Sequence, residues 1–174
     1  MSAPAPSAEL LAKAAKVRMF VTDVDGVWTD GFVTVHADGT ESVRFSIQDG
    51  YGIVALQKAG VEFVIISGRL NPAVEHRARR LGVETVHLGV KEKGGLLDEL
   101  IAARGLAPEE VAAIGDDLPD LPLFERAGVR LAPPGAVAEV RARADWTTAA
   151  RAGDGCLREA CDLLLAARAA ASAR

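Results

Sequence analysis

Residues 19–27, Met-Phe-Val-Thr-Asp-Val-Asp-Gly-Val, join a short apolar run to two aspartates and a glycine. The apolar run predicts a buried strand, and open α/β sheets bind ligands just beyond the carboxyl ends of their strands. Three more apolar runs, at 61–66, 85–88 and 111–114, are also followed by polar groups. These groups are Ser67-Gly68-Arg69, then Lys91 and Lys93, then Gly115-Asp116-Asp117-Leu118-Pro119-Asp120.

The same runs decide the fold class, because a helix-like segment precedes each of the last three. Strands that alternate with helices predict a doubly wound, Rossmann-like parallel sheet with helices on both faces. Residues 32–45 interrupt the alternation and predict a β-hairpin that turns at Asp38-Gly39, a dipeptide suited to positive φ angles. No long insertion separates the first two strands, so we expect no cap domain and an open site in a monomer. Apolar residues at helical spacing predict a final helix over 156–170.

Bulk composition narrows the class of protein. A chain of 174 residues with 49% hydrophobic content fits one domain, which we place at 17–174, with 1–16 as a loose or helical extension. A net charge of -4 argues against nucleic acid as chief partner. The sequence indicates neither a signal peptide nor a membrane span. Both cysteines, Cys156 and Cys161, fall on the final helix, where they cannot join distant segments, so a reducing cytoplasm fits best.

The carboxylates of Asp23, Asp25 and Asp116 are predicted to meet at one edge of the sheet. Like charges this close require compensation by a cation. Oxygen ligands with room for a phosphate are typical of Mg²⁺. The three histidines show no ligand-like spacing, which argues against zinc. We therefore expect Mg²⁺.

Such a site has the groups that phosphoryl transfer requires. Asp23 is the predicted nucleophile and would form an aspartyl-phosphate. Asp25 would protonate the leaving oxygen and later activate water. Ser67 would hydrogen-bond a phosphoryl oxygen, and Lys93 would balance the charge of phosphate and nucleophile. The sequence therefore predicts a magnesium-dependent phosphohydrolase that acts on a phosphate monoester.

Taken in order, the four strand-end motifs resemble those of the haloacid dehalogenase superfamily. Each is by itself a common turn sequence, and their value lies in their position. Within that superfamily, residues 23–31, 45–53 and 115–122 and the capless length resemble the 3-deoxy-D-manno-octulosonate 8-phosphate phosphatases of lipopolysaccharide biosynthesis and their sialic-acid-type relatives. The resemblance runs from residue 17 to the carboxyl terminus.

The resemblance implies roles for particular residues. Asp23, the backbone carbonyl of Asp25, and Asp116 would hold Mg²⁺. The resemblance also implies a homotetramer in which the hairpin and C-terminal tail of neighbours help to close each site. Family spacing favours Lys93 over Lys91. Substrate contacts are implied for Asp25, Ser46, Ile47, Gln48, Asp49, Gly50, Gly68, Arg69, Arg77 and Lys93.

Departures from the family pattern leave the substrate open. Relatives that act on the octulosonate commonly carry basic residues where this chain has Gln48, Val54 and Asp154, and less positive charge weakens recognition of a sugar carboxylate. The nearest rival substrate is a nonulosonate 9-phosphate. Two other hypotheses are a non-catalytic oligomerisation module, against which the complete carboxylate set argues, and a phosphatase for bulky or macromolecular phosphates, which a monomer would favour.

Overall fold

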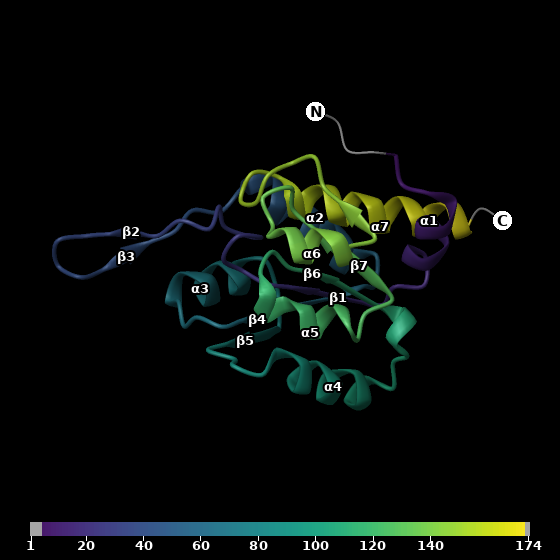
Figure 1. Cartoon of the computed structure of the whole chain (residues 1–174), viewed down its shortest axis with the longest axis horizontal. Coiled ribbons are helices and arrows are strands. Elements are labelled where there is room, and N and C mark those ends of the chain that lie inside the picture. The colour runs from purple at the N-terminus through teal and green to yellow at the C-terminus, as the bar shows by residue number, and fades with distance from the viewer. Residues whose placement is uncertain (1–4, 173–174) are drawn as a thin grey trace.

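A six-stranded parallel sheet forms the centre of the protein (Figure 1). The structure is a computed structural model that describes residues 5–172. The strand order is β5-β4-β1-β6-β7-β8, and every neighbouring pair is parallel. The strands are β1 (Met19–Thr22), β4 (Glu62–Ser67), β5 (Thr85–Leu88), β6 (Val111–Ile114), β7 (Val129–Ala132) and β8 (Trp146–Thr147).

Strand β1 lies inside the sheet, between β4 and β6, and all four of its residues are buried. Its side chains alternate between two hydrophobic clusters, with Phe20 in one and Met19 and Val21 in the other. This explains why the run is continuously apolar, because a parallel strand covered on both faces has no solvent side. After β1 the chain adds β4 and β5 on one side of β1, and it then adds β6, β7 and β8 on the other side. The strand order therefore changes direction at β1, and sheets of this kind bind ligands at such a point.

Helices cover both faces of the sheet (Figure 1). The cluster that contains Phe20 is closed by α1 (Ala8–Ala14), α2 (Ile47–Lys58), α3 (Pro72–Arg80) and α7 (Cys156–Ser172). The opposite cluster is closed by α4 (Lys93–Arg104), α5 (Leu121–Phe124) and α6 (Ala138–Arg143). Two short 3₁₀ turns lie at Pro108–Glu110 and Leu118–Asp120.

These observations confirm the predicted doubly wound sheet. Three predicted strands match β1, β5 and β6, and β4 begins and ends one residue later than expected. The final helix is confirmed and runs on to Ser172. Strands β7 and β8 and helices α5 and α6 were not predicted. Within residues 5–172, no helix is long and apolar enough to cross a bilayer.

The predicted N-terminal extension contains helix α1, which Ser7 caps by accepting the N–H of Leu10. Leu10 and Ala14 are buried in the cluster that also holds residues of α7. The helical part of the extension therefore packs into the same core as the rest of the chain.

The hairpin is present but shorter and differently turned than expected. Its strands are β2 (Thr34–Val35) and β3 (Glu41–Ser42), and they project from the body beside α3 (Figure 1). The N–H of Gly39 donates to the carbonyl of His36, and the N–H of His36 donates to the carbonyl of Thr40. Only Gly39 of the Asp38-Gly39 pair has a positive φ, at 84°. The connection is thus a three-residue loop that ends in a left-handed glycine, not a two-residue turn.

Candidate active site

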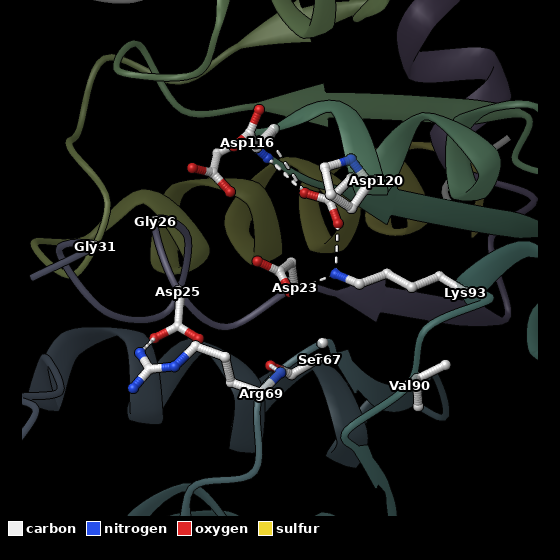
Figure 2. A pocket seen from close by; sticks show the side chains of 13 residues that line it. Asp23, Asp25, Gly26, Gly31, Ser67, Arg69, Val90, Lys93, Asp116 and Asp120 are labelled. Atoms are coloured by element: carbon white, nitrogen blue, oxygen red, sulfur yellow. Dashed lines mark hydrogen bonds and ion pairs between the residues drawn. The ribbon is translucent and has the colours of Figure 1, made fainter. Parts of the chain in front are cut away.

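The four strand-end motifs meet around one open pocket of about 380 Å³ (Figure 2). This confirms that polar groups far apart in the sequence gather at the carboxyl edge of the sheet. The pocket is lined by Asp23, Asp25, Gly26, Gly31, Ser67, Gly68, Arg69, Val90, Lys93, Asp116, Asp117, Pro119 and Asp120.

Lys93 forms the central contact of the pocket. Its Nζ lies 2.6 Å from Oδ1 of Asp23 and 2.6 Å from Oδ1 of Asp120, and its side chain is only 5% exposed (Figure 2). Lys93 is also the first residue of α4, where the helix dipole disfavours a cation. The carboxylates of Asp23 and Asp120 compensate for this unfavourable interaction with the helix dipole. The position of the lysine is therefore fixed by partners that follow β1 and β6. Lys91 is exposed and does not line the pocket.

Asp120 organises the loop after β6. It is 1% exposed, and its Oδ2 accepts the backbone N–H of Asp116 at 2.9 Å and of Asp117 at 3.3 Å. A side chain at Gly115 would overlap that of Asp120. The sequence reading placed Asp120 in the motif but assigned it no role. Its position four residues after Asp116 was the available signal, because a carboxylate there can accept the N–H groups of a tight turn.

The pocket holds more negative charge than Lys93 neutralises. Burial, together with the Asp120 carboxylate, raises the pKa of Asp23 to about 7 against the opposing effect of Lys93. Burial and the neighbouring carboxylates, Asp120 first, raise the pKa of Asp116 to about 7 as well. Both pKa shifts show that the ionised forms of these carboxylates are disfavoured unless positive charge is added to the pocket.

The donors fit a hard divalent cation. Among residues 5–172, Asp23, Asp116 and Asp120 form a set in which one carboxylate oxygen of each lies within 4.8 Å of the others. Asp120 already accepts from Lys93 and from backbone N–H groups, which makes Asp23 and Asp116 the better ligands. Gly26, at a φ of 83°, lies so near that a Cβ would overlap the Asp116 carboxylate. Oxygen-only ligation of this kind suits Mg²⁺.

The third carboxylate of this cluster is therefore Asp120, and the expectation that the Asp25 side chain would fill that place is corrected. Asp25 lies in the same pocket but turns to Arg69, whose Nη1 donates to its Oδ1 at 2.9 Å (Figure 2). The cause is the loop geometry: β1 has ended at Thr22, so Asp23 and Asp25 do not follow the alternation of a strand. The implied contact of the Asp25 carbonyl with the metal stays a prediction.

Ser67 and Arg69 are anchored by the turn after β4. The hydroxyl oxygen of Ser67 accepts the backbone N–H of Arg69 at 3.3 Å. Ser67 is 2% exposed and lines the pocket. Because this bond uses the oxygen as an acceptor, the hydroxyl proton remains free to be donated to a ligand.

The segment 46–50, for which substrate contacts were implied, does not line this pocket. Asp49 is fully buried, and its carboxylate accepts the N–H of Arg158 at 2.8 Å and of Gly155 at 3.4 Å, at the start of α7. Its side chain therefore joins α2 to α7 and is not available to a ligand, which corrects the expectation for this residue. Ile47, in contrast, is 83% exposed.

Arg77 also lies outside the lining of the pocket. Its guanidinium covers Gly50, where a Cβ would come within 2.6 Å of Nη2. Close packing of α3 on the first turn of α2 thus depends on a glycine at position 50. The substrate contacts implied for Ser46, Ile47, Gln48, Gly50 and Arg77 stay predictions.

Comparison with known proteins agrees with this geometry. Residues 89–159 match the model of the haloacid dehalogenase-like hydrolase family. The chain is 39% identical to the 3-deoxy-D-manno-octulosonate 8-phosphate phosphatase of Escherichia coli over 162 residues. This aligned region covers 93% of this chain and 86% of the relative.

Solved structures show the same likeness. The corresponding phosphatase from Moraxella catarrhalis, in complex with magnesium, phosphate and KDO, aligns with a TM-score of 0.90 and 36% identity over 95% of both chains. A probable YrbI family phosphatase from Pseudomonas syringae aligns with a TM-score of 0.91 and 42% identity, over 96% of this chain and 97% of that one.

We expect Mg²⁺ to raise the thermal stability of the protein through Asp116. A ligand at 100 times its Kd stabilises the folded state by about 2.7 kcal/mol, which corresponds to about 5–10 °C in Tm for a chain of this size. Calorimetry with Mg²⁺ and with EDTA should show this rise in the wild type and its loss in Asp116→Asn. Asp117→Asn, which removes a neighbouring exposed carboxylate, is the control and should keep it. An equal response in all three proteins would disprove a metal site at Asp116.

Proposed function

Because this chain belongs to the family of 3-deoxy-D-manno-octulosonate 8-phosphate phosphatases within the haloacid dehalogenase-like hydrolases, we propose that it hydrolyses that phosphate monoester to the free sugar acid and phosphate. One observation carries the proposal. The carboxylate of Asp23, at the end of β1, is held by Lys93 in an open pocket beside Asp116, in a chain 39% identical to such an enzyme over 162 residues.

The first step is attack on phosphorus by the Asp23 carboxylate. An oxygen–phosphorus bond forms to Asp23 as the bond from phosphorus to the sugar oxygen breaks, and Asp25 gives its proton to that oxygen. Mg²⁺ held by Asp23 and Asp116 would supply the positive charge that keeps Asp23 ionised and balances the phosphate. Lys93 keeps Asp23 in place for the attack.

The second step releases phosphate. Asp25 takes a proton from a water molecule whose oxygen attacks the aspartyl-phosphate, and the bond from phosphorus to Asp23 breaks. The hydroxyl of Ser67 donates a hydrogen bond to a phosphoryl oxygen. An ammonium has three donors, and Lys93 uses two for Asp23 and Asp120, which leaves the third for phosphate.

Phosphate release from a panel of sugar-acid phosphates tests this function. With Mg²⁺, the octulosonate 8-phosphate should be the best substrate, and a nonulosonate 9-phosphate should be slower. EDTA should abolish turnover, and Asp23→Asn should lower kcat by at least about 10⁴-fold, as expected when a nucleophile is removed. Preference for the nonulosonate would transfer the assignment to that substrate. Equal activity of Asp23→Asn would refute the aspartyl-phosphate.

We also propose that the active form is a homotetramer in which neighbours cover the open pockets. The support is a set of exposed apolar side chains on and next to the hairpin, in α2 and in the turn after β4, since such surface favours association. Their exposed fractions are 77% for Phe32, 67% for Val35, 83% for Ile47, 65% for Tyr51 and 77% for Leu70.

Light scattering after size-exclusion chromatography should then give four times the chain mass of 18.2 kDa. Val35→Asp places a charge on the apolar hairpin and should lower the measured mass, because an unpaired charge is costly to bury in an interface. Lys58→Asp, at the far end of α2, is the control and should leave the mass unchanged. A monomeric wild type would favour a bulky phosphate as substrate instead.

A basic group lies beside Asp154, where relatives commonly carry an arginine. Asp154, Arg44 and Arg151 line one cavity of about 440 Å³. Arg44 is engaged by Asp30, since its Nε lies 2.7 Å from Oδ2 of that residue. No ion pair or side-chain hydrogen bond of Arg151 is found among residues 5–172. We assign Arg151 the recognition of the sugar carboxylate in place of the missing arginine.

Arg151→Ala should therefore raise KM for the octulosonate 8-phosphate by about 10- to 100-fold, because a hydrogen bond to a charged group contributes about 1.5–3 kcal/mol. The KM for p-nitrophenyl phosphate, which lacks a carboxylate, should not change. Steady-state kinetics with both substrates measures the difference. An equal rise for both would show a structural effect and not recognition of the carboxylate.

The proposed location is the cytoplasm. Cys156 and Cys161 are both buried and free, as expected for a protein that folds under reducing conditions. Burial raises the pKa of both thiols well above the usual value, so neither is a reactive thiolate.

A further inference from the structure

Among residues 5–172, one side-chain hydrogen bond joins the outer part of the hairpin, residues 34–42, to the body. Glu41, which opens β3 and pairs with Val35, places Oε2 at 2.8 Å from Nη2 of Arg69. The residues of β2 and β3 are otherwise exposed. In the described part of the chain, the other side-chain hydrogen bonds from residues 34–42 stay inside the hairpin, between His36 and Ser42 and between Asp38 and Thr40.

Arg69 lies between the hairpin and the pocket. Its Nη1 donates to Oδ1 of Asp25 at 2.9 Å while Nη2 donates to Glu41. Its backbone is fixed by the bond from its N–H to Ser67 and by the N–H of Gly89, which donates to its carbonyl at 3.3 Å. The side chain, however, is 40% exposed. The guanidinium therefore depends on its two carboxylate partners for its orientation.

We propose that Glu41 is a positioning residue, which docks the hairpin on Arg69 and thereby holds the guanidinium that orients Asp25. This inference rests on the proposed function, in which Asp25 exchanges protons with the leaving oxygen and with water. An exposed arginine has many rotamers, and a second carboxylate restricts them because the planar fork binds one partner on each terminal nitrogen. Asp25 then meets the substrate in a prepared orientation, which contributes to the rate and not to substrate affinity.

Removal of the carboxylate should therefore lower kcat and leave KM unchanged. We expect Glu41→Ala to lower kcat for the octulosonate 8-phosphate about tenfold, the change that about 1.4 kcal/mol in the barrier produces, with KM within about twofold of the wild type. Glu41→Gln keeps an oxygen that accepts from Nη2 and should restore most of the loss. Asp38→Ala removes a carboxylate of the same hairpin whose hydrogen-bond partner, within residues 5–172, is Thr40, and it should match the wild type.

A double-mutant cycle tests whether Glu41 acts through Arg69. Arg69→Ala should lower kcat at least as much as Glu41→Ala does, and addition of Glu41→Ala to Arg69→Ala should cause no further loss. Losses that multiply in the double variant would overturn the inference, because Glu41 would then act by another route. The proteins are compared at equal Mg²⁺ and after their masses have been measured by light scattering.

The remaining outcomes are equally decisive. If Glu41→Ala has the same kcat as the wild type, the inference on Glu41 is wrong. The proposed function would still stand in that case, because the wild type turns over the substrate. A fall in kcat that accompanies a fall in oligomeric mass would also overturn it, because the hairpin would then act through assembly. An inactive wild type would instead refute the proposed function, which keeps the two failures distinguishable.

Discussion

The ammonium of Lys93 is the interaction on which the rest of the site depends. It joins the end of β1, through Asp23, to the loop after β6, through Asp120, with both contacts at 2.6 Å. All three side chains are less than 10% exposed. Buried charges of this kind persist only when each has a partner, because loss of one partner leaves an uncompensated charge in the interior. The strand ends and the start of α4 are thereby held in one arrangement.

That arrangement leaves a surplus of negative charge, which makes the pocket suitable for phosphate chemistry. Three carboxylates gather around one lysine, and the pKa values of Asp23 and Asp116 rise to about 7. Two glycines permit the crowding: a Cβ at Gly26 would overlap Asp116, and one at Gly115 would overlap Asp120. A divalent cation and Lys93 together can then balance these carboxylates and an incoming phosphate. The carboxylates attract the cation, and the missing Cβ at Gly26 leaves room for the Asp116 carboxylate to take part in binding it.

The hairpin and the first turn of α2 differ from this buried centre. The buried centre is fixed by charge pairs and close packing, whereas the hairpin and the first turn of α2 expose apolar side chains such as Phe32, Ile47 and Tyr51. Asp49 joins the first turn of α2 to the body by accepting N–H groups at the start of α7. Arg69 joins the hairpin to the body through Glu41. The buried centre is therefore held by charge pairs, and these surface segments are tied to it by single polar residues.

The sequence by itself determined the doubly wound sheet, the carboxyl edge as the site, and Asp23, Ser67, Lys93 and Asp116 as members of one pocket. These follow from local information, since apolar runs predict buried strands and parallel strands bring their ends to one edge. Only the tertiary structure decided the partners. It showed that Asp120 joins the carboxylate cluster, that Asp25 turns to Arg69, and that Asp49 caps α7. Contacts of this kind join residues far apart in the chain or depend on the path of a loop, and neither periodicity nor motif spacing specifies which of several nearby carboxylates a given donor meets.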